Sequence, residues 1–502
     1  MRAGEGTAPV TAGDRAGTLR SSRQGDPMKQ LTGLDNSFLR LEGPTMYGHV
    51  ASLAIFDPAT APHAVGYQDV RELVEQRLHL VPPFRRRLVE VPMGLDHPYW
   101  IEDPDFDLDF HLRHIAEPPP GDRHQLAELA VRIAARHLDR SRPLWEMYVI
   151  EGLEGGHIAQ LTKIHHACID GVAGAEILGV LLDIEPEAPP TPPPAEPWQW
   201  EREPSSSEML ARGMLGAATR PRVGLRLMRE TVPAFGSLMR NFALNAPGVK
   251  RRDDVLSRPS VQAPRTSLNG VISPHRRFSF GSLPLESVKT VKNAFDATVN
   301  DVVMAICAGA LRRWLIEHEE LPELPLLAMV PVSVRDDSER GAGGNRVSAM
   351  VAVLPTDEPD PVKRVRAMRG EMAVAKHEHG ALPASLLQDL TQFTPPSVLG
   401  TANRVATRAR LMDRVNLPFN VIISNVPGPQ FPLYTNGARM EGIYPISAIV
   451  DGVGLNMTLM SYNGSLDFGL VADREMVPDI WLLIDYLRDE LEQLEKLAEN
   501  RP

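Results

Sequence analysis

Cysteine is scarce in this 502-residue chain, which contains only Cys168 and Cys307. Two cysteines cannot form a disulfide scaffold or a cysteine-rich zinc site, and their scarcity is typical of proteins in a reducing cytoplasm. The chain also lacks an apolar run of the roughly 18–20 residues that a membrane span needs. We therefore expect a cytoplasmic protein that is soluble or only peripherally associated with a membrane.

Several motifs of enzymes and binding proteins are also absent. No G-x-S-x-G occurs, which disfavours a serine hydrolase, and no HExxH occurs among the scattered histidines, so we expect no metal site. Neither a Walker A loop nor a G-x-G-x-x-G loop is present to hold phosphates. The formal net charge of −11 disfavours binding to nucleic acid.

Strand-like and helix-like patterns alternate in two regions of the chain, with a proline-rich stretch, "EPEAPPTPPPAEPW", between them. Such a stretch cannot pack as a helix or a strand, so it marks a boundary. We predict a disordered tail over residues 1–27, an N-terminal domain over 28–185, a linker and basic helical crossover over 186–265, and a C-terminal domain over 266–502.

Alternating and apolar runs predict the strands, and apolar positions at helical spacing predict the helices. The predicted strands are 49–56, 144–153, 157–167, 326–335, 346–355, 419–426, 452–464 and 465–473. The predicted helices are 70–81, 124–138, 174–184, 298–320 and 477–499.

Residues 206–252 carry nine basic and two acidic side chains, in contrast to the acidic chain as a whole. Basic surface helices are common, so this segment is interpreted first as a solvated pair of bridging helices. The alternative is a contact surface for anionic lipid or for phosphates.

The most informative stretch is "LTKIHHACIDGVAGAEIL", which places two adjacent histidines between a strand and a helix. On a strand or tight turn, His165 and His166 point in opposite directions and cannot easily chelate one ion. Imidazole is well suited to general-base chemistry near neutral pH, so one ring could face a channel while the other is held in the scaffold. Asp170 could brace the turn through an ion pair, and Gly171 permits the backbone geometry that starts the next helix. Cys168, between apolar neighbours, is expected to be an inert thiol.

"HHACIDG" fits the HHxxxDG motif of the CoA-dependent acyltransferase superfamily. The chain as a whole resembles the bacterial wax ester synthase/diacylglycerol acyltransferase family, and most closely the triacylglycerol synthases of actinobacteria. The resemblance extends from residue 31 to about residue 495. It is carried by "LTGLDNSFLRLEGPTMYGHVASLAIF", "PPFRRRLVEVP", "RPLWEMYVIEGL", "LNGVISPHRRFSF", "TVNDVVMAICAGALRRWL", "AMVPVSVR", "FNVIISNVPGP" and "GLNMTLMSYNGSLDFGLVAD".

The resemblance implies an α/β fold of the two-layer α+β kind, built from two chloramphenicol-acetyltransferase-like domains with an active-site tunnel between them. It implies that His166 is the general base and acid, that His165 supports it, and that Asp170 and Gly171 are structural. By analogy with the superfamily, Asp170 is expected to pair with an arginine from residues 85–87.

The implied reaction transfers a fatty acyl group from long-chain acyl-CoA to a diacylglycerol, without a covalent acyl-enzyme and without a cofactor, since acyl-CoA is a substrate. Asn300, Asp301 and Asn425 are candidates for the oxyanion site or tunnel lining. Simpler roles are helix capping for Asn300 or Asp301 and turn formation for Asn425. Lys289, Lys292 and the basic 206–252 segment are candidates for contacting the CoA phosphates.

Three alternatives remain open. A wax ester synthase would use a long-chain alcohol as acceptor, and a condensation-type enzyme would take its acyl group from a carrier protein. A non-enzymatic coat protein of lipid droplets is the third. A lipid substrate also implies peripheral contact with the inner membrane face or with lipid droplets.

Overall fold

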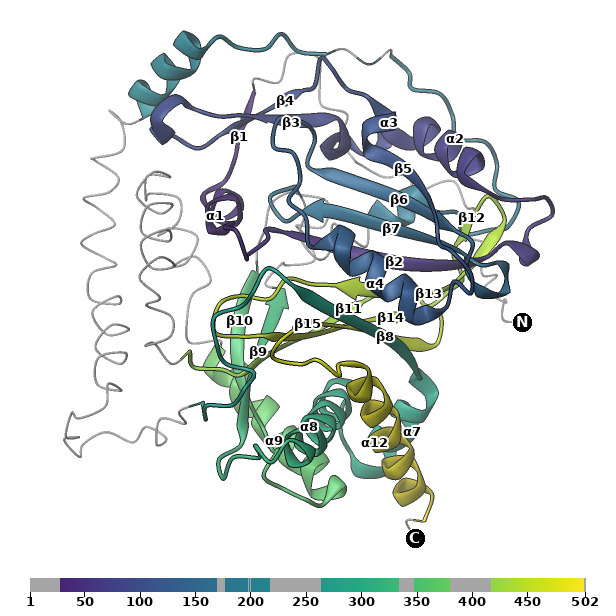
Figure 1. Ribbon diagram of the computed structural model, residues 1–502, viewed down its shortest axis with the longest axis vertical. Coiled ribbons are helices and arrows are strands. Elements are labelled where there is room, and N and C mark those ends of the chain that lie inside the picture. The colour runs from purple at the N-terminus through teal and green to yellow at the C-terminus, as the bar shows by residue number, and fades with distance from the viewer. Residues whose placement is uncertain are drawn as a thin grey trace, which may run out of the picture.

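The computed structural model describes residues 28–168, 177–196, 198, 200–216, 263–333, 347–379 and 417–500. Two six-stranded sheets form its framework, with strand orders β12-β13-β2-β7-β6-β5 and β10-β9-β11-β14-β15-β8 (Figure 1). A three-stranded sheet of order β1-β4-β3 lies beside the first of them. The predicted residues 1–27 and most of the predicted basic crossover lie outside the described part of the chain.

The strands of each sheet and the helices have the following residue ranges. The first sheet contains β2 (His49–Asp57), β5 (Leu112–Ala116), β6 (Trp145–Glu151), β7 (Ile158–His165), β12 (Tyr434–Thr435) and β13 (Ala438–Ile446). The second contains β8 (Arg276–Pro284), β9 (Leu326–Ser333), β10 (Val347–Leu354), β11 (Val421–Pro427), β14 (Leu455–Tyr462) and β15 (Ser465–Asp473). The small sheet contains β1 (Lys29–Gln30), β3 (Arg86–Val89) and β4 (Tyr99–Glu102). The helices are α1 (Gly33–Leu41), α2 (Tyr67–Arg77), α3 (Leu108–His111), α4 (Arg123–Ala134), α7 (Leu285–Phe295), α8 (Val299–Glu317), α9 (Pro361–His379) and α12 (Trp481–Glu499).

The first sheet is covered on both faces, and its strand β7 is buried along its whole length. Ala159 and Leu161 pack in a core cluster that includes α4, whereas Ile158 and Ile164 pack in a cluster that includes α2. A strand buried on both faces is normally apolar throughout. The polar residues near the end of β7 therefore need partners inside the protein.

The second sheet is covered on one face by α7, α8, α9 and α12 (Figure 1). Helix α8 is the most deeply buried of them, because every residue from Asp301 to Leu311 is buried. In the described part of the chain no single helix is long and apolar enough to cross a membrane. Helices α7 and α8 together have the length and apolar composition of a membrane span, but a bend of 101° separates them.

The two halves of the chain interlock. Strands β12 and β13 come from the C-terminal half but extend the first sheet, where Ile443 of β13 pairs with Ala54 of β2. Helix α4 comes from the N-terminal half and packs against β8 of the second sheet, where Arg123 Nη2 donates to the Phe280 carbonyl at 2.7 Å. The proline-rich stretch thus separates the halves in sequence, although each half contributes to the packing of the other.

The elements expected from sequence periodicity match the structure well. Each predicted strand coincides with a strand, and the predicted helices 70–81, 124–138, 298–320 and 477–499 correspond to α2, α4, α8 and α12. Strand β13 was not predicted, although its residues carry the connection between the two halves. The predicted helix 174–184 is described only from residue 177, where it is helical.

Candidate active site

The histidine pair lies where β7 ends and a tight turn begins. His165 is the last residue of β7 and is only 1% exposed, whereas His166 is half-buried. Backbone hydrogen bonds fix both residues: His165 N–H donates to the Leu144 carbonyl at 3.0 Å, and His166 N–H donates to the Gly48 carbonyl at 2.9 Å. The adjacent histidines thus occupy different environments, as their positions on a strand end predict.

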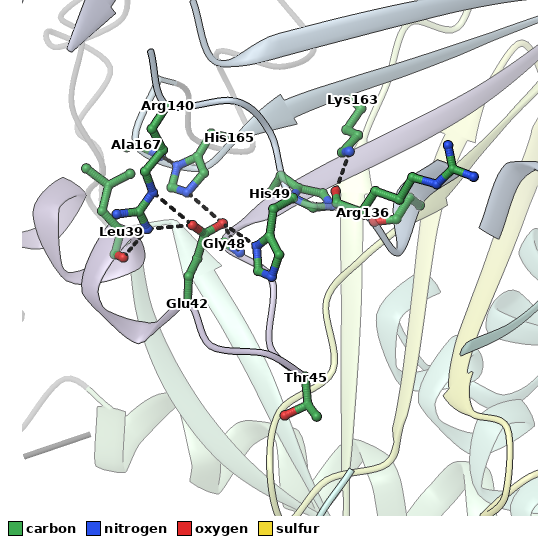
Figure 2. A network of polar contacts seen from close by, with 12 residues as sticks. Leu39, Glu42, Thr45, Gly48, His49, Arg136, Arg140, Lys163, His165 and Ala167 are labelled. Carbon is green, nitrogen blue, oxygen red and sulfur yellow. Dashed lines mark hydrogen bonds and ion pairs between the residues drawn. The ribbon is translucent and has the colours of Figure 1, made fainter. Parts of the chain in front are cut away.

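The ring of His165 is held in one tautomer by its neighbours (Figure 2). Its Nδ1 accepts a hydrogen bond from the Ala167 N–H at 3.0 Å, so the proton of a neutral ring lies on Nε2. Nε2 is 3.3 Å from Oε1 of Glu42. The Ala167 hydrogen bond also closes the turn that carries His166, so the His165 ring supports that turn.

Glu42 is the centre of this network and follows directly after α1. Its carboxylate accepts from Arg140 Nη2 at 2.5 Å and from the Gly48 N–H at 3.0 Å. His137 Nδ1 is 3.7 Å away. Burial opposes ionisation, but the nearby imidazoles of His137 and His165 and the Arg140 guanidinium outweigh it and hold the pKa of Glu42 well below its usual value. Glu42 therefore presents an ionised carboxylate to the His165 ring.

Gly48 leaves no room for a side chain beside the first histidine. A Cβ atom at this position would lie 2.6 Å from Nε2 of His165 and 2.8 Å from the Phe38 carbonyl oxygen. Both separations are below the contact distance of carbon with nitrogen or oxygen, so glycine is required here for steric reasons.

His166 stacks on a phenylalanine from α1. The ring centroids of Phe38 and His166 are 4.6 Å apart, and the ring planes differ by 12°. One short helix thus supplies both contacts, since Phe38 reaches the second histidine and Glu42 reaches the first.

Two buried polar side chains, Lys163 and His49, fix the end of α4, which precedes the loop that brings Arg140 to Glu42 (Figure 2). Lys163 is fully buried and donates to the Ile133 carbonyl at 3.3 Å and to the Arg136 carbonyl. His49 Nε2 is 2.6 Å from the Ala134 carbonyl oxygen. These donors satisfy carbonyl groups that a helix end leaves without partners.

Burial lowers the pKa of both donors. Desolvation lowers the pKa of Lys163 to about 8, although the Glu146 carboxylate 3.6 Å away opposes this shift. Desolvation and the charge on Lys163 lower the pKa of His49 to about 3, so His49 is neutral near pH 7.

Asp170 and Gly171 lie outside the described residues, and the proposed ion pair of Asp170 stays a prediction. The three arginines considered as its partner have other carboxylates nearby. Arg86 pairs with Glu102 at 2.7 Å, Arg87 pairs with Asp103 at 3.0 Å, and Arg85 lies 3.8 Å from Glu102.

The three candidates for the oxyanion site lie together in the second sheet and its helix layer, and two of their simpler roles are corrected. The N-cap of α8 is Thr298, with Asp301 accepting from the Thr298 N–H at 2.9 Å, so Asn300 does not cap the helix. Asn425 lies inside β11 and not in a turn. Its Nδ2 is 3.5 Å from Oδ1 of Asn300, the outer limit for a hydrogen bond.

Other predicted features can be placed only in part. Cys168 is half-buried, and desolvation together with the Asp35 carboxylate raises the pKa of its thiol, in agreement with an inert cysteine. Lys289 and Lys292 lie on α7, which is far from α1 (Figure 1). On α7, Lys289 pairs with Glu286 at 3.3 Å. Within the described ranges, no three histidine, cysteine, aspartate or glutamate side chains are grouped to bind a metal.

Sequence reasoning missed Glu42, Phe38, Gly48, His49 and Lys163. The stretch "SFLRLEGPTMYGHV" contained the first four, but nothing in its spacing indicates which of them meets a residue more than a hundred positions away. Lys163 and His49 carried a weak signal, because each is a polar residue in a run otherwise typical of a buried strand.

Nearly the whole chain is similar to known protein families and proteins. Residues 31–303 match the family model of the wax ester synthase/diacylglycerol acyltransferase catalytic domain, and residues 343–495 match the C-terminal domain of the same family. A Mycobacterium tuberculosis protein whose name provisionally assigns it diacylglycerol O-acyltransferase activity is 37% identical over 95% of this chain and 92% of its own length.

Solved structures show the same similarity. The wax ester synthase/diacylglycerol acyltransferase of Marinobacter aquaeolei VT8 superposes with a TM-score of 0.66 and 31% identity, covering 94% of this chain and 100% of the other. A trichothecene 15-O-acetyltransferase of Fusarium sporotrichioides, at 11% identity, shares the fold with a TM-score of 0.57 over 93% and 95% of the two chains.

These similarities confirm the predicted α/β fold class with its two-domain arrangement. The catalytic-domain model alone spans more than half of the sequence, and the bacterial relatives are more than 30% identical over nearly all of it. The chain therefore belongs to the wax ester synthase/diacylglycerol acyltransferase family.

Proposed function

We propose that this protein transfers a fatty acyl group from long-chain acyl-CoA to the free hydroxyl group of a diacylglycerol, forming triacylglycerol. Family membership and the named activity of the mycobacterial relative support the reaction class. The observation that carries the assignment to a site is the half-buried ring of His166, set next to a fully buried histidine whose tautomer is fixed.

His166 acts first as base and then as acid in this proposal. It accepts the proton of the hydroxyl group as the oxygen attacks the thioester carbonyl carbon. The tetrahedral intermediate collapses with cleavage of the carbon–sulfur bond, and His166 returns the proton to the departing CoA sulfur. The new ester bond replaces the thioester bond, so acyl-CoA is consumed as a substrate and no cofactor is needed.

The surrounding residues position the ring rather than react. His165, held by Glu42 and by the Ala167 N–H, keeps the turn in shape. Because the transfer needs little more than alignment of two substrates and exclusion of water, a rigid placement of the imidazole makes a large contribution to the rate. Asn300 and Asn425 stay candidates for stabilising the oxyanion through their amide groups.

The absence of an acyl-enzyme can be tested by intact-mass spectrometry. We expect the purified protein, incubated with palmitoyl-CoA in the absence of an acceptor, to keep its mass. A stoichiometric gain of one palmitoyl group would contradict the proposed direct transfer.

The acceptor and donor are tested together by thin-layer chromatography of labelled products. Palmitoyl-CoA is offered with dioleoylglycerol and with hexadecanol in parallel, and a palmitoylated carrier protein replaces palmitoyl-CoA in a third reaction. We expect triacylglycerol from palmitoyl-CoA. The name of the Marinobacter enzyme favours hexadecanol as a second acceptor. Product from the carrier-bound donor alone would indicate a condensation-type enzyme.

We also propose that the protein contacts the cytoplasmic membrane face or lipid droplets through its basic 206–252 segment, since diacylglycerol resides in lipid. Changing Arg220, Arg222, Arg226 and Arg229 together to glutamate should lower cosedimentation with liposomes that contain anionic phospholipid. Binding equal to that of the unchanged protein would leave the segment as a connector.

A further inference from the structure

Helix α1 buries three polar side chains while its aromatic side chain stays half-buried. Its polar residues Asp35, Asn36 and Ser37 are buried at 7% exposure or less, whereas its aromatic residue Phe38 is only half-buried. Burial of polar groups costs free energy unless they are hydrogen-bonded, and an apolar ring gains free energy by burial. The position of Phe38 is therefore not explained by the packing of α1 alone.

The helix that carries Phe38 is held firmly at both ends. Thr32 caps its start by accepting from the Asp35 N–H at 3.2 Å, and Ser37 Oγ donates to the Leu34 carbonyl at 2.6 Å. At its end, Arg140 Nη2 donates to the Leu39 carbonyl at 2.5 Å. The backbone of Phe38 is thus a fixed platform for its side chain.

Phe38 meets the one half-buried histidine of the pair. The flanking residues His165 and Ala167 are buried, whereas His166 is half-buried, as Phe38 is on α1. Their stacking, with centroids 4.6 Å apart and planes 12° from parallel, uses one face of the imidazole and neither of its nitrogen atoms.

The backbone of His166 is fixed by its hydrogen bond to the Gly48 carbonyl, but a histidine ring rotates about its second side-chain torsion between broad energy wells. A parallel aromatic ring restricts that rotation, because tilting the imidazole would break the contact. Aromatic contacts of this kind are favourable by an amount that depends on ring geometry.

We propose that Phe38 is a positioning residue, which sets the plane of the His166 ring for proton transfer by stacking on it. This inference rests on the proposed function of His166. It predicts that an aromatic ring, and not merely apolar volume, is needed at residue 38.

The test compares Phe38→Leu and Phe38→Tyr, using initial rates with palmitoyl-CoA and dioleoylglycerol. Loss of the aromatic contact in Phe38→Leu should lower kcat about two- to tenfold, with KM for palmitoyl-CoA unchanged within about twofold. Phe38→Tyr should keep kcat within about twofold. Phe106→Leu is the matched control, because Phe106 is also half-buried and stacks on a histidine, His111, with centroids 5.3 Å apart and planes at 9°. It should leave kcat unchanged.

Two results would overturn the inference: equal losses of kcat in Phe38→Leu and Phe38→Tyr, or a rise in KM with kcat unchanged, which would make Phe38 a substrate contact. His166→Ala, assayed beside them, separates this inference from the proposed function. If His166→Ala is inactive and both Phe38 variants keep the full rate, only the role of Phe38 is wrong. If His166→Ala keeps the full rate, the proposed function is wrong.

Discussion

Among single residues, Glu42 joins three segments of the chain through one carboxylate. It accepts from Gly48 of its own loop, from Arg140 after α4, and faces His165 at the end of β7. A buried carboxylate is stable only when charges and donors compensate for its lost hydration. The network therefore ties the end of β7 to the residue after α1 and to the loop after α4.

Replacing Glu42 by Gln should weaken both stability and activity. The amide removes the charge that Arg140 and the two histidines compensate, so we expect the free energy of unfolding to fall by about 1–3 kcal/mol. We expect kcat to fall about tenfold or more, because the His165 ring loses the negative charge that faces its Nε2 atom and helps to hold it in place. Glu90→Gln is the control, since Glu90 is half-exposed and its ion pair with Arg40, at 2.9 Å, lies at the surface.

Urea unfolding and initial rates measure both effects. The stability difference between the unchanged protein and Glu42→Gln should narrow as the pH falls below about 4.3, because the lowered pKa of Glu42 stabilises the fold only while the unfolded carboxyl is ionised. A Glu42→Gln variant with unchanged stability and rate would show that the network has no role.

Gly48 and Gly43 provide a matched pair of glycines on one loop. Gly48→Ala would force a methyl group to within 2.6 Å of the His165 ring, so we expect a loss of about 1–3 kcal/mol in stability and a clear loss of activity. Nothing lies within 4 Å of a Cβ at Gly43, and Gly43→Ala should change stability by less than about 0.5 kcal/mol. Equal behaviour of the two variants in urea unfolding would contradict the steric argument.

Among the helices and strands, the elements of the core were predictable and the contacts of the site were not. Periodicity identified β7 and α4, because burial on one or two faces leaves a repeating apolar pattern. It could not reveal that Lys163 and His49 bind the carbonyl groups at the end of α4, since that contact depends on how β2, β7 and α4 pack. The HHxxxDG motif located the histidines, but Glu42 and Phe38 became visible only once α1 was placed beside the turn.

The end of α4 should give the protein a measurable sensitivity to acid. His49 has a folded-state pKa of about 3, below the value of about 6.5 in an unfolded chain. The unfolded state therefore binds a proton between these pH values while the folded state does not, and stability falls as the pH drops through that range. The contribution is about 1.4 kcal/mol for each pH unit below about 6.5.

Urea unfolding at pH 7.5 and pH 5.5 measures this effect. His49→Gln keeps an N–H donor for Ala134 but does not titrate, so its stability should fall less than that of the unchanged protein between the two pH values. His63→Gln, at an exposed loop position, should behave like the unchanged protein. An identical pH dependence in His49→Gln would contradict the assignment of a buried neutral His49.

The molecule as a whole is held together where β13 crosses from the second half into the first sheet (Figure 1). The Ile443 N–H of β13 donates to the buried Asp467 carboxylate of β15 at 2.9 Å. Nearby, the Pro445 backbone approaches Gly469 so closely that a Cβ there would lie 1.8 Å from the Pro445 oxygen. Two halves that each mix strands and helices were predictable from the sequence, but this exchange of a strand was not. The alternation of "ARME" ends at the irregularity between Met440 and Gly442, and it does not indicate which sheet the strand joins.

Gly469→Ala should therefore separate the two sheets locally and destabilise the whole protein. Because the obstructing atom belongs to the backbone, we expect a loss of at least about 3 kcal/mol or a failure to accumulate folded protein. Gly370→Ala is the control on the exposed side of α9, where nothing lies within 4 Å and alanine should stabilise the helix by about 0.5–1 kcal/mol. A Gly469→Ala protein that unfolds at the same urea concentration as the unchanged protein would contradict the close approach of the two sheets.

The account as a whole depends on the imidazole of His166, and the rate of acyl transfer in His166→Ala tests it. Release of CoA from palmitoyl-CoA that depends on dioleoylglycerol should fall by about 100-fold or more, while urea unfolding stays close to that of the unchanged protein. A folded His166→Ala protein that keeps more than about a tenth of the rate would show that another group carries the proton.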